Sequence, residues 1–276
     1  MYSFLCVKAL QKISLCVIIA VNFKNKGEIT VKVIVLENAY EISKQAAEIY
    51  IKQINKKPGS VLGFATGASP VETYKRIIES YEKGEVSLKH ITTFNLDEYA
   101  DLDRENVNSY YYFMKDNLFG KTDVDFNKVN FLSGVKPEEA EAECKRYYEK
   151  IKESGGIDIQ LLGIGTNGHI GFNEPGDDFK DGPFLVKLTQ STIDSNKKYF
   201  EAVGTEMPGY ALTMGVGDIM RAKKIVLIAT GESKAKAIKA LVEGEVTPEC
   251  PASILKLHSD VTIFLDKESA SLLGDR

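Results

Sequence analysis

From residue 31 onward, short runs of apolar residues alternate with segments in which apolar residues recur every three or four positions. The short runs predict β-strands and the periodic segments predict amphipathic helices. We expect strands at 31–37, 61–66, 90–95, 128–133, 157–164, 184–190, 223–230 and 260–265. We expect helices at 41–56, 71–82, 138–153 and 234–243. The alternation of the two element types is typical of an α/β protein with a parallel sheet.

The segment 223–230 reads Lys-Lys-Ile-Val-Leu-Ile-Ala-Thr and is nearly continuous in apolar residues. This pattern is typical of a strand that helices cover on both faces of a parallel sheet. Residues 31–276 contain no internal repeat, low-complexity tract or linker rich in Pro and Gly. The sequence therefore predicts a single α/β domain with a Rossmann-like, open and mostly parallel sheet and helices on both faces.

Residues 1–30 differ from the rest of the chain. The apolar run at 13–21 follows Lys8 and Lys12 and faintly resembles a signal peptide. It is far shorter than the ~20 apolar residues that cross a bilayer, and no small-residue cleavage site follows it. We expect residues 1–30 to be an extension outside the fold, added by translation from an upstream start, and residues 31–276 to form the domain. Mass spectrometry of the native protein would contradict this if it found residues 1–30.

Composition and charge narrow the possible classes of function. The formal net charge is -4, whereas a general nucleic-acid binder carries a basic excess. The four cysteines lack metal-ligand spacing, which favours a reducing compartment, the cytoplasm. We therefore expect neither nucleic acid nor a membrane as a partner.

Ligands of open α/β sheets bind beyond the carboxyl ends of the strands, and a candidate anion site follows the second expected strand. In Ala65-Thr-Gly-Ala-Ser-Pro70, we expect Ser69 to be the N-cap of a helix, with Glu72 completing a capping box. Free amides at such a helix start can hold a phosphate. A plain capped turn is the alternative. No Gly-Lys-Ser/Thr follows, so the loop is not a Walker A motif.

Two adjacent carboxylates, Asp97 and Glu98, follow the strand at 90–95. Neighbouring side chains of an extended segment face opposite ways, so one of the two can enter a cleft while the other faces away. A carboxylate in a cleft is a candidate base for a C–H proton beside a carbonyl group. A purely structural cap is the alternative.

The glycine-rich segment after the strand at 157–164 holds Asn167, His169 and Glu174. A histidine in such a loop, with a carboxylate five residues further on, predicts an acid–base element. A structural histidine is the alternative. A zinc site is not expected, because one histidine without a nearby cysteine supplies too few ligands.

These motifs resemble those of the glucosamine-6-phosphate deaminase family. The resemblance rests on Phe94-Asn-Leu-Asp-Glu-Tyr99 and on Gly163-Ile-Gly-Thr-Asn-Gly-His-Ile-Gly-Phe-Asn-Glu-Pro175, and it covers nearly all of residues 31–276. It implies an enzyme of amino-sugar catabolism that converts glucosamine 6-phosphate and water to fructose 6-phosphate and ammonia. It also implies that neither a metal nor an organic cofactor takes part.

The resemblance further implies a role for each matching residue. Asp97 would move a proton between C2 and C1 of the opened sugar through an enolamine. His169, with Glu174 and Asn167, would open the pyranose ring, although many relatives have Asp where this chain has Asn167. The segment 176–210 would act as a lid that excludes water.

The remaining implied positions are substrate-binding residues and other residues of the active site. Lys198 stands where the family usually has Arg, and Lys197 could substitute for it. Glu98 and Tyr99 would be further active-site residues. The phosphate would be bound by Thr66, Gly67, Ala68, Ser69 and Lys234.

Three other functions stay open at this point. The chain could be a galactosamine-6-phosphate deaminase or isomerase, or a 6-phosphogluconolactonase, although Glu174 argues against the lactonase. It could also be a non-catalytic sugar-phosphate sensor, although no helix-turn-helix pattern precedes the domain. The oligomeric state stays open as well, monomer or homo-oligomer. The C-terminal extension of longer relatives is lacking, which favours a non-allosteric monomer by analogy.

Overall fold

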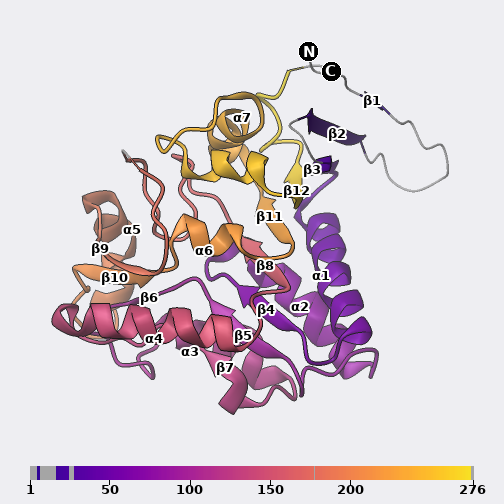
Figure 1. The fold of residues 1–276 in the computed structure, drawn as a ribbon. Coiled ribbons are helices and arrows are strands. Elements are labelled where there is room, and N and C mark those ends of the chain that lie inside the picture. Colours follow the sequence, from indigo (N-terminus) through magenta and orange to yellow (C-terminus); the bar gives the residue numbers. More distant parts are fainter. Residues whose placement is uncertain (1–4, 7–16, 25–27, 177, 275–276) are drawn as a thin grey trace.

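The computed structural model describes residues 5–6, 17–24, 28–176 and 178–274. Its main sheet has the strand order β1-β2-β3-β12-β11-β8-β4-β5-β7 (Figure 1). From β3 to β7 every neighbouring pair is parallel. These strands are β3 (Glu28–Leu36), β4 (Val61–Phe64), β5 (Thr92–Asn95), β7 (Val129–Asn130), β8 (Ile159–Leu162), β11 (Ile225–Ala229) and β12 (Asp260–Asp266). The predicted parallel sheet is confirmed.

Helices cover both faces of this sheet, as predicted. One core cluster holds apolar side chains of α1 (Ala39–Lys56), α2 (Ala68–Glu82) and α3 (Tyr110–Asn117). The other cluster holds side chains of α4 (Ala140–Glu153), α6 (Val216–Met220) and α7 (Ala235–Glu243). Short 3₁₀ helices lie at η1 (Phe119–Lys121), η2 (Phe126–Lys128), η3 (Pro137–Glu139), η4 (Glu232–Lys234) and η5 (Pro251–Leu257).

Helix α1 shows how the sequence pattern produces these elements. The side chain of Asn38 accepts the N–H of Glu41 and caps the helix start. Ile42, Ala46, Tyr50 and Ile54 recur at four-residue steps and are all buried. This single apolar stripe fixes which face of the helix lies against the sheet.

A second, antiparallel sheet of three strands carries the order β6-β10-β9. Its strands are β6 (Asp97–Tyr99), β10 (Tyr210–Thr213) and β9 (Phe184–Lys187), and α5 (Gln190–Glu201) connects β9 to β10. Figure 1 shows β9, β10 and α5 together at the left of the view. The strand expected at 184–190 therefore belongs to this small sheet, and its assignment to the main sheet was wrong. An apolar run alone does not reveal which strands it pairs with.

The first expected strand begins earlier than residue 31. β3 starts at Glu28 and pairs antiparallel with β2 (Val17–Lys24), which in turn pairs with β1 (Leu5–Cys6). Residues 17–24 thus lie between β1 and β3, near one edge of the sheet. Both a genuine N-terminal segment and one added by translation from an upstream start could pair in this way. The upstream start of residues 1–30 therefore stays a prediction.

The order of the strands creates a switch point at the centre of the sheet. After β4 the chain adds β5 and β7 on one side, and it then returns to place β8 on the other side of β4. β11 follows next to β8. The carboxyl ends of β4, β8 and β11 therefore lie next to one another, where ligands bind in such sheets.

At the opposite end of the sheet, a buried carboxylate joins three segments. Asp158, just before β8, accepts the N–H of Val61 at 2.8 Å and contacts the ammonium groups of Lys57 and Lys223, each at 2.7 Å. Burial works to raise the pKa of Asp158, but the two lysines and the amide outweigh it and hold this pKa below its ordinary value.

We expect Asp158→Asn to lower the free energy of unfolding by about 1–3 kcal/mol at pH 7, because it removes charge-assisted hydrogen bonds. A lowered folded-state pKa stabilises the fold above the pKa of the unfolded chain, and this contribution is lost as the pH falls through the folded value. Urea unfolding at pH 7 and at about pH 3 measures both effects. The difference between variant and wild type should shrink at the lower pH, and an equal difference at both would contradict the assignment.

Candidate active site

The loop after β4 leads directly into α2. The N-cap of α2 is Gly67, with φ 100°, and the helix begins at Ala68. The prediction that Ser69 caps this helix was wrong, because glycine tolerates positive φ and lets the chain enter the helix earlier. Glu72 completes no capping box and pairs instead with Lys75 and Arg76.

This geometry still suits an anion. The amides of the first helical turn have no partner within the helix, and the helix N-terminus attracts negative charge. A Cβ atom on Gly67 would meet nothing within 4 Å, so the space beside the loop is open. Thr66, Gly67, Ala68 and Ser69 all lie at this helix start.

A lysine follows the end of β11, two strands away in the sheet. Lys234 ends η4 and directly precedes α7, and its side chain is half-buried. Burial lowers the pKa of Lys234, and within the described ranges no carboxylate is paired with its ammonium group. At the spacing of neighbouring strands, β4 and β11 are about 10 Å apart. A desolvated cation on one side and free amides on the other can flank a sugar phosphate.

Asp97 and Glu98 lie on β6 and face opposite ways, as the alternation of a strand predicts. Asp97 is buried, with Oδ2 3.4 Å from the position that a Cβ of Gly171 would take. Glu98 instead accepts the backbone N–H groups of Tyr110 and Tyr111, at the start of α3. Asp97 is thus the member of the pair that contacts the glycine-rich loop.

Asp97 has the protonation behaviour of a base that works near neutral pH. Burial, and secondarily the neighbouring Glu98, raises the pKa of Asp97 to about 8. A general base is most effective when its pKa lies close to the working pH. Asp97 is therefore better suited to remove a proton near neutral pH than an exposed carboxylate with an ordinary pKa.

The loop after β8 gathers Asn167, His169 and Glu174. The amide of Asn167 donates to Oε2 of Glu174 at 2.7 Å, and Nδ1 of His169 lies 3.4 Å from Oε1 of the same carboxylate. The side chain of Asn167 also accepts the N–H of His169 at 3.2 Å. The interaction with His169 lowers the pKa of Glu174, although burial opposes it. An ionised glutamate therefore lies beside the imidazole.

Two glycines make this arrangement possible. A Cβ on Gly165 would fall 2.2 Å from Cε1 of His169, so the imidazole packs directly on the Gly165 backbone. Gly171, with φ 57°, lies between Asp97 and the buried hydroxyl of Thr213. The loop therefore carries the His169 group and, at Gly171, also contacts the Asp97 carboxyl, although the two come from different sheets.

The segment 176–210 contains β9 and α5, the helix that carries both candidate lysines. Lys197 lies 3.5 Å from Glu201 in an ion pair. Lys198 is exposed and contacts only the ring of Tyr199 among the interactions found in the described residues. The charge of Lys198 is thus more available to a ligand than the charge of Lys197.

Tyr99, the third residue of β6, packs in an aromatic cluster. Its ring contacts Tyr110, Phe172 and, edge to face at 5.4 Å, Phe200 of α5. Tyr99 therefore joins the segment 176–210 to the glycine-rich loop.

The sequence did not single out two residues that support the glycine-rich loop. The hydroxyl of Thr213 accepts the N–H of Phe172 at 3.1 Å. The thiol of Cys250 packs under Gly168, 2.6 Å from the position of a Cβ there. The role of neither residue could be predicted from the sequence, and the pairing of β10 with β6 brings Thr213 opposite Asp97.

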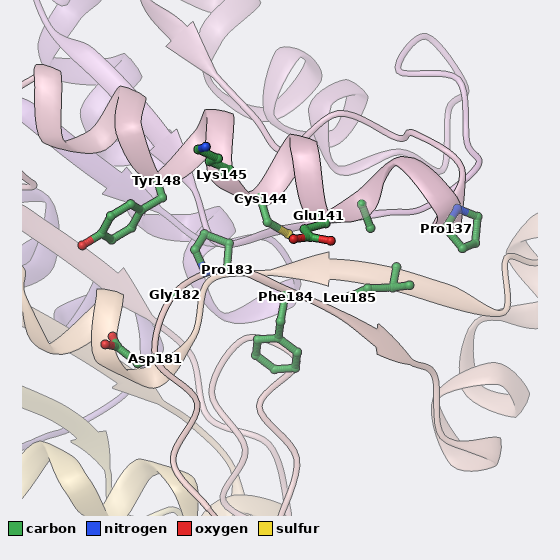
Figure 2. Close-up of a pocket in the computed structure, with 11 residues that line it drawn as sticks. Pro137, Glu141, Cys144, Lys145, Tyr148, Asp181, Gly182, Pro183, Phe184 and Leu185 are labelled. Atoms are coloured by element: carbon green, nitrogen blue, oxygen red, sulfur yellow. The ribbon is translucent and has the colours of Figure 1, made fainter.

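A cavity of about 610 Å³ lies elsewhere, between α4 and the chain that leads into β9. Figure 2 shows Cys144, Lys145 and Tyr148 on the helix, opposite Asp181 and Phe184. None of the candidate catalytic residues lines it. The candidate active site is therefore identified from the contacts between its side chains and loops, and not from this cavity. Over the described ranges, no cluster of His, Cys, Asp and Glu could hold a metal ion, and no helix could cross a membrane.

We expect Lys234→Met to raise KM for a phosphorylated substrate about 10- to 100-fold, because it removes a charge-assisted hydrogen bond. kcat should change much less, since Lys234 lies away from the carbon atoms that react. Steady-state kinetics on Lys234→Met and on Lys236→Met, an exposed lysine in the first turn of α7, provide the comparison. Equal KM values in the two variants would exclude Lys234 from phosphate binding.

The chain matches the family model described as "Glucosamine-6-phosphate isomerases/6-phosphogluconolactonase" over residues 37–264. A glucosamine-6-phosphate deaminase of Thermoanaerobacter sp. (strain X514) is 49% identical over 244 residues, which are 88% of this chain and 96% of that protein. A protein of the same name from Clostridium botulinum (strain Langeland / NCTC 10281 / Type F) is 46% identical over 242 residues, 88% and 98% of the two chains.

Solved structures agree with this. A monomeric glucosamine-6-phosphate deaminase has a TM-score of 0.82 and 43% identity, covering 87% of this chain and 99% of its own. The 6-phosphogluconolactonase from Trypanosoma brucei has a TM-score of 0.69 at 18% identity, over 88% and 98% of the two chains. At that low identity the likeness to the lactonase shows the fold alone.

Proposed function

Since the chain belongs to the family of glucosamine-6-phosphate isomerases and 6-phosphogluconolactonases, we propose that it converts glucosamine 6-phosphate and water to fructose 6-phosphate and ammonia. One observation carries this proposal. A buried carboxyl, Asp97, meets a loop in which Asn167 and His169 both contact Glu174. Isomerisation needs a base for a carbon-bound proton, and ring opening needs a separate acid–base group.

The first step opens the pyranose ring. His169 takes the proton of the anomeric hydroxyl and returns a proton to the ring oxygen, which leaves an aldehyde at C1. Glu174 stabilises the imidazolium that forms between the two transfers, and Asn167 holds Glu174 in position. Asn167 carries no charge, but its amide orients the carboxylate as an ionised aspartate could not.

The second step moves a proton between carbon atoms. Ionised Asp97 removes the proton from C2, next to the aldehyde and the aminium group, while a proton passes from the aminium group to the aldehyde oxygen, and an enolamine forms. The same carboxyl then gives a proton to C1, which yields an imine at C2. Water adds to this imine and ammonia leaves, so atoms and charge balance for one sugar, one water and one ammonia.

The phosphate is held away from the reacting carbons. Thr66, Gly67, Ala68 and Ser69 offer the open start of α2, and Lys234 adds a half-buried cation. Lys198 on α5 supplies a further charge when the lid, residues 176–210, lies over the substrate. A closed lid excludes water while the enolamine exists.

The wider setting belongs to the same proposal. We place the reaction in amino-sugar catabolism in the cytoplasm, where cysteines such as Cys144 and Cys250, both free, remain reduced. The substrate is a small phosphorylated amino sugar, and the residues above perform the chemistry without a metal or an organic cofactor. We expect no nucleic-acid partner.

Activity should rise with pH until Asp97 is ionised. Its pKa of about 8 lies far above the usual range of an aspartate, so the protonated form prevails at neutral pH and below. We therefore expect kcat/KM to increase with pH through a limb near pH 8, since this quantity reports the free enzyme. A pH profile of kcat/KM checks this, and a limb near pH 4 would show that Asp97 is not perturbed as described.

The substrate is tested by comparing three compounds. Purified protein is given glucosamine 6-phosphate, galactosamine 6-phosphate or 6-phosphogluconolactone, and kcat/KM is measured for each. The proposal predicts the highest value for glucosamine 6-phosphate. A preference for the galactose epimer would keep the chemistry and change the substrate, whereas hydrolysis of the lactone alone would overturn the reaction class.

A further inference from the structure

Glu98 is the buried neighbour of Asp97, and its carboxylate has unusually many backbone partners. Oε1 accepts the N–H groups of Tyr99 and Tyr110, each at 2.9 Å, and Oε2 accepts the N–H of Tyr111 at 2.9 Å. The residue is only 2% exposed. One side chain thus joins its own strand to the beginning of a helix twelve residues further along the chain.

The contacts complete the N-terminus of α3. Tyr110 and Tyr111 are the first two residues of the helix, so their N–H groups have no partner within it. The N-cap Ser109 accepts the N–H of Tyr112 at 3.0 Å. Glu98 and Ser109 together therefore satisfy the first turn of α3, and a negative charge is favourable at this end of a helix.

This joint lies one residue from the candidate base. β6 has only three residues, Asp97, Glu98 and Tyr99, and only one strand, β10, pairs with it in the part of the chain that is described. A strand this short has little stiffness of its own. With Glu98 tied to α3 on one face, the Asp97 carboxyl on the other face is held against Gly171.

We propose that Glu98 is a positioning residue of the reaction, whose buried carboxylate fastens β6 to the start of α3 and thereby fixes the orientation and the electrostatic surroundings of Asp97. This inference rests on the proposed deaminase function and names a further residue for it. Glu98 touches no substrate and acts through its neighbour.

The charges around the two carboxyls define the expected electrostatic effect. The titratable groups that interact electrostatically with Asp97 are Glu98 and Tyr99 on its own strand, Tyr110 of α3 and Tyr147 of α4. Glu98 is faced by Arg104, and it lines a cavity of about 420 Å³ together with Arg104 and Arg146. Burial raises the pKa of Glu98 to about 7, against the lowering effect of the three amides and Arg104.

The sign of the effect on Asp97 follows from these positions. A negative charge on Glu98 disfavours a second negative charge on Asp97, and so it raises the pKa of Asp97. A neutral residue at position 98 should lower that pKa. The limb of the kcat/KM profile that belongs to Asp97 should then move to lower pH.

Two variants separate charge from position. Glu98→Gln removes the charge but keeps the length of the side chain. Its amide N–H₂ then points at the N–H of Tyr111, and two donors cannot form the hydrogen bond that Oε2 accepted. Glu98→Asp keeps the charge but is one methylene too short to reach both helix amides. Glu143→Gln is the matched control, because Glu143 is also buried and accepts a backbone N–H, from Ser133, but lies on α4.

We expect both Glu98 variants to lose about 10- to 100-fold in kcat, the size of effect that a misplaced catalytic group produces, with KM nearly unchanged. In Glu98→Gln the limb of kcat/KM should also move down by roughly one pH unit, whereas in Glu98→Asp it should stay. Glu143→Gln should lower the thermal midpoint without moving the limb. A structural defect alone would lower the amount of folded enzyme in all three and shift none of the profiles.

Titration of the Asp97 carboxyl carbon by ¹³C NMR gives a second readout that needs no activity. A lower pKa of Asp97 in Glu98→Gln supports the inference even if the wild type turns over a different substrate, which would overturn the proposed function alone. If Glu98→Gln fails to fold, kcat and KM of Glu98→Asp test whether Glu98 positions Asp97. Wild-type kcat in Glu98→Asp, or an unmoved Asp97 titration in a folded Glu98→Gln, would overturn the inference.

Discussion

Asp97→Asn is expected to lower kcat for ammonia release by about 10²- to 10⁴-fold, the usual range for the loss of a general base. The amide has nearly the shape of the carboxyl but cannot take a proton from C2. KM should change little, since the phosphate-binding residues lie on other loops. A coupled assay for ammonia at saturating glucosamine 6-phosphate measures the effect.

The same variant should be at least as stable as the wild type. The folded-state pKa of Asp97, about 8, lies above the ordinary value of an aspartate, so the folded protein binds more protons than the unfolded chain between about pH 4 and pH 8. Stability from this group is therefore present at acidic pH and is lost as the pH rises through 8. The thermal midpoint of Asp97→Asn should exceed that of the wild type more at pH 9 than at pH 5. Retained activity in a folded variant would exclude Asp97 as the base.

His169→Gln should lower kcat/KM by about 10²- to 10³-fold, because ring opening then lacks its acid–base group. The remaining turnover should depend on the small amount of open-chain sugar that forms in water without a catalyst. With increasing variant concentration, the rate of fructose 6-phosphate formation should therefore reach a plateau equal to the uncatalysed rate of ring opening.

His90→Gln is the control for this experiment, because His90 is exposed and precedes β5, at the end of that strand opposite to the one that Asp97 follows. It should keep wild-type kinetics. If the rate of His169→Gln rose in proportion to enzyme concentration without a plateau, ring opening would still be catalysed and the role assigned to His169 would be wrong.

The parallel sheet was predictable from the sequence because its strands are buried on both faces. β11 is fully buried from Ile225 to Ala229, and an uninterrupted apolar run is what such a position requires. β6 and β10 were missed for the opposite reason. β6 consists of three residues, two of them acidic, and its burial arises from partners that lie far away in the chain.

The candidate site was predictable to the level of its loops. Because ligands bind beyond the carboxyl ends of the strands in such sheets, the segments after β4 and β8 could be singled out from the sequence. The strand order that places them side by side came only from the structure. The start of α2 could not be predicted, since it depends on the positive φ of Gly67. The partners of Glu98 could not be predicted either, because no apolar pattern revealed α3. Sequence propensity describes only the local preference of the backbone, whereas the start of α2 and the partners of Glu98 depend on tertiary contacts.

In the proposed reaction this chain releases ammonia by isomerisation, with Asp97 removing the proton at C2. The most direct measurement uses glucosamine 6-phosphate that carries deuterium at C2 and follows the products by NMR. We predict fructose 6-phosphate and ammonia in equal amounts, with the deuterium found partly at C1 and partly in the water. An aldose phosphate that keeps deuterium at C2 while ammonia is released would contradict the account, because it would mean simple substitution at that carbon.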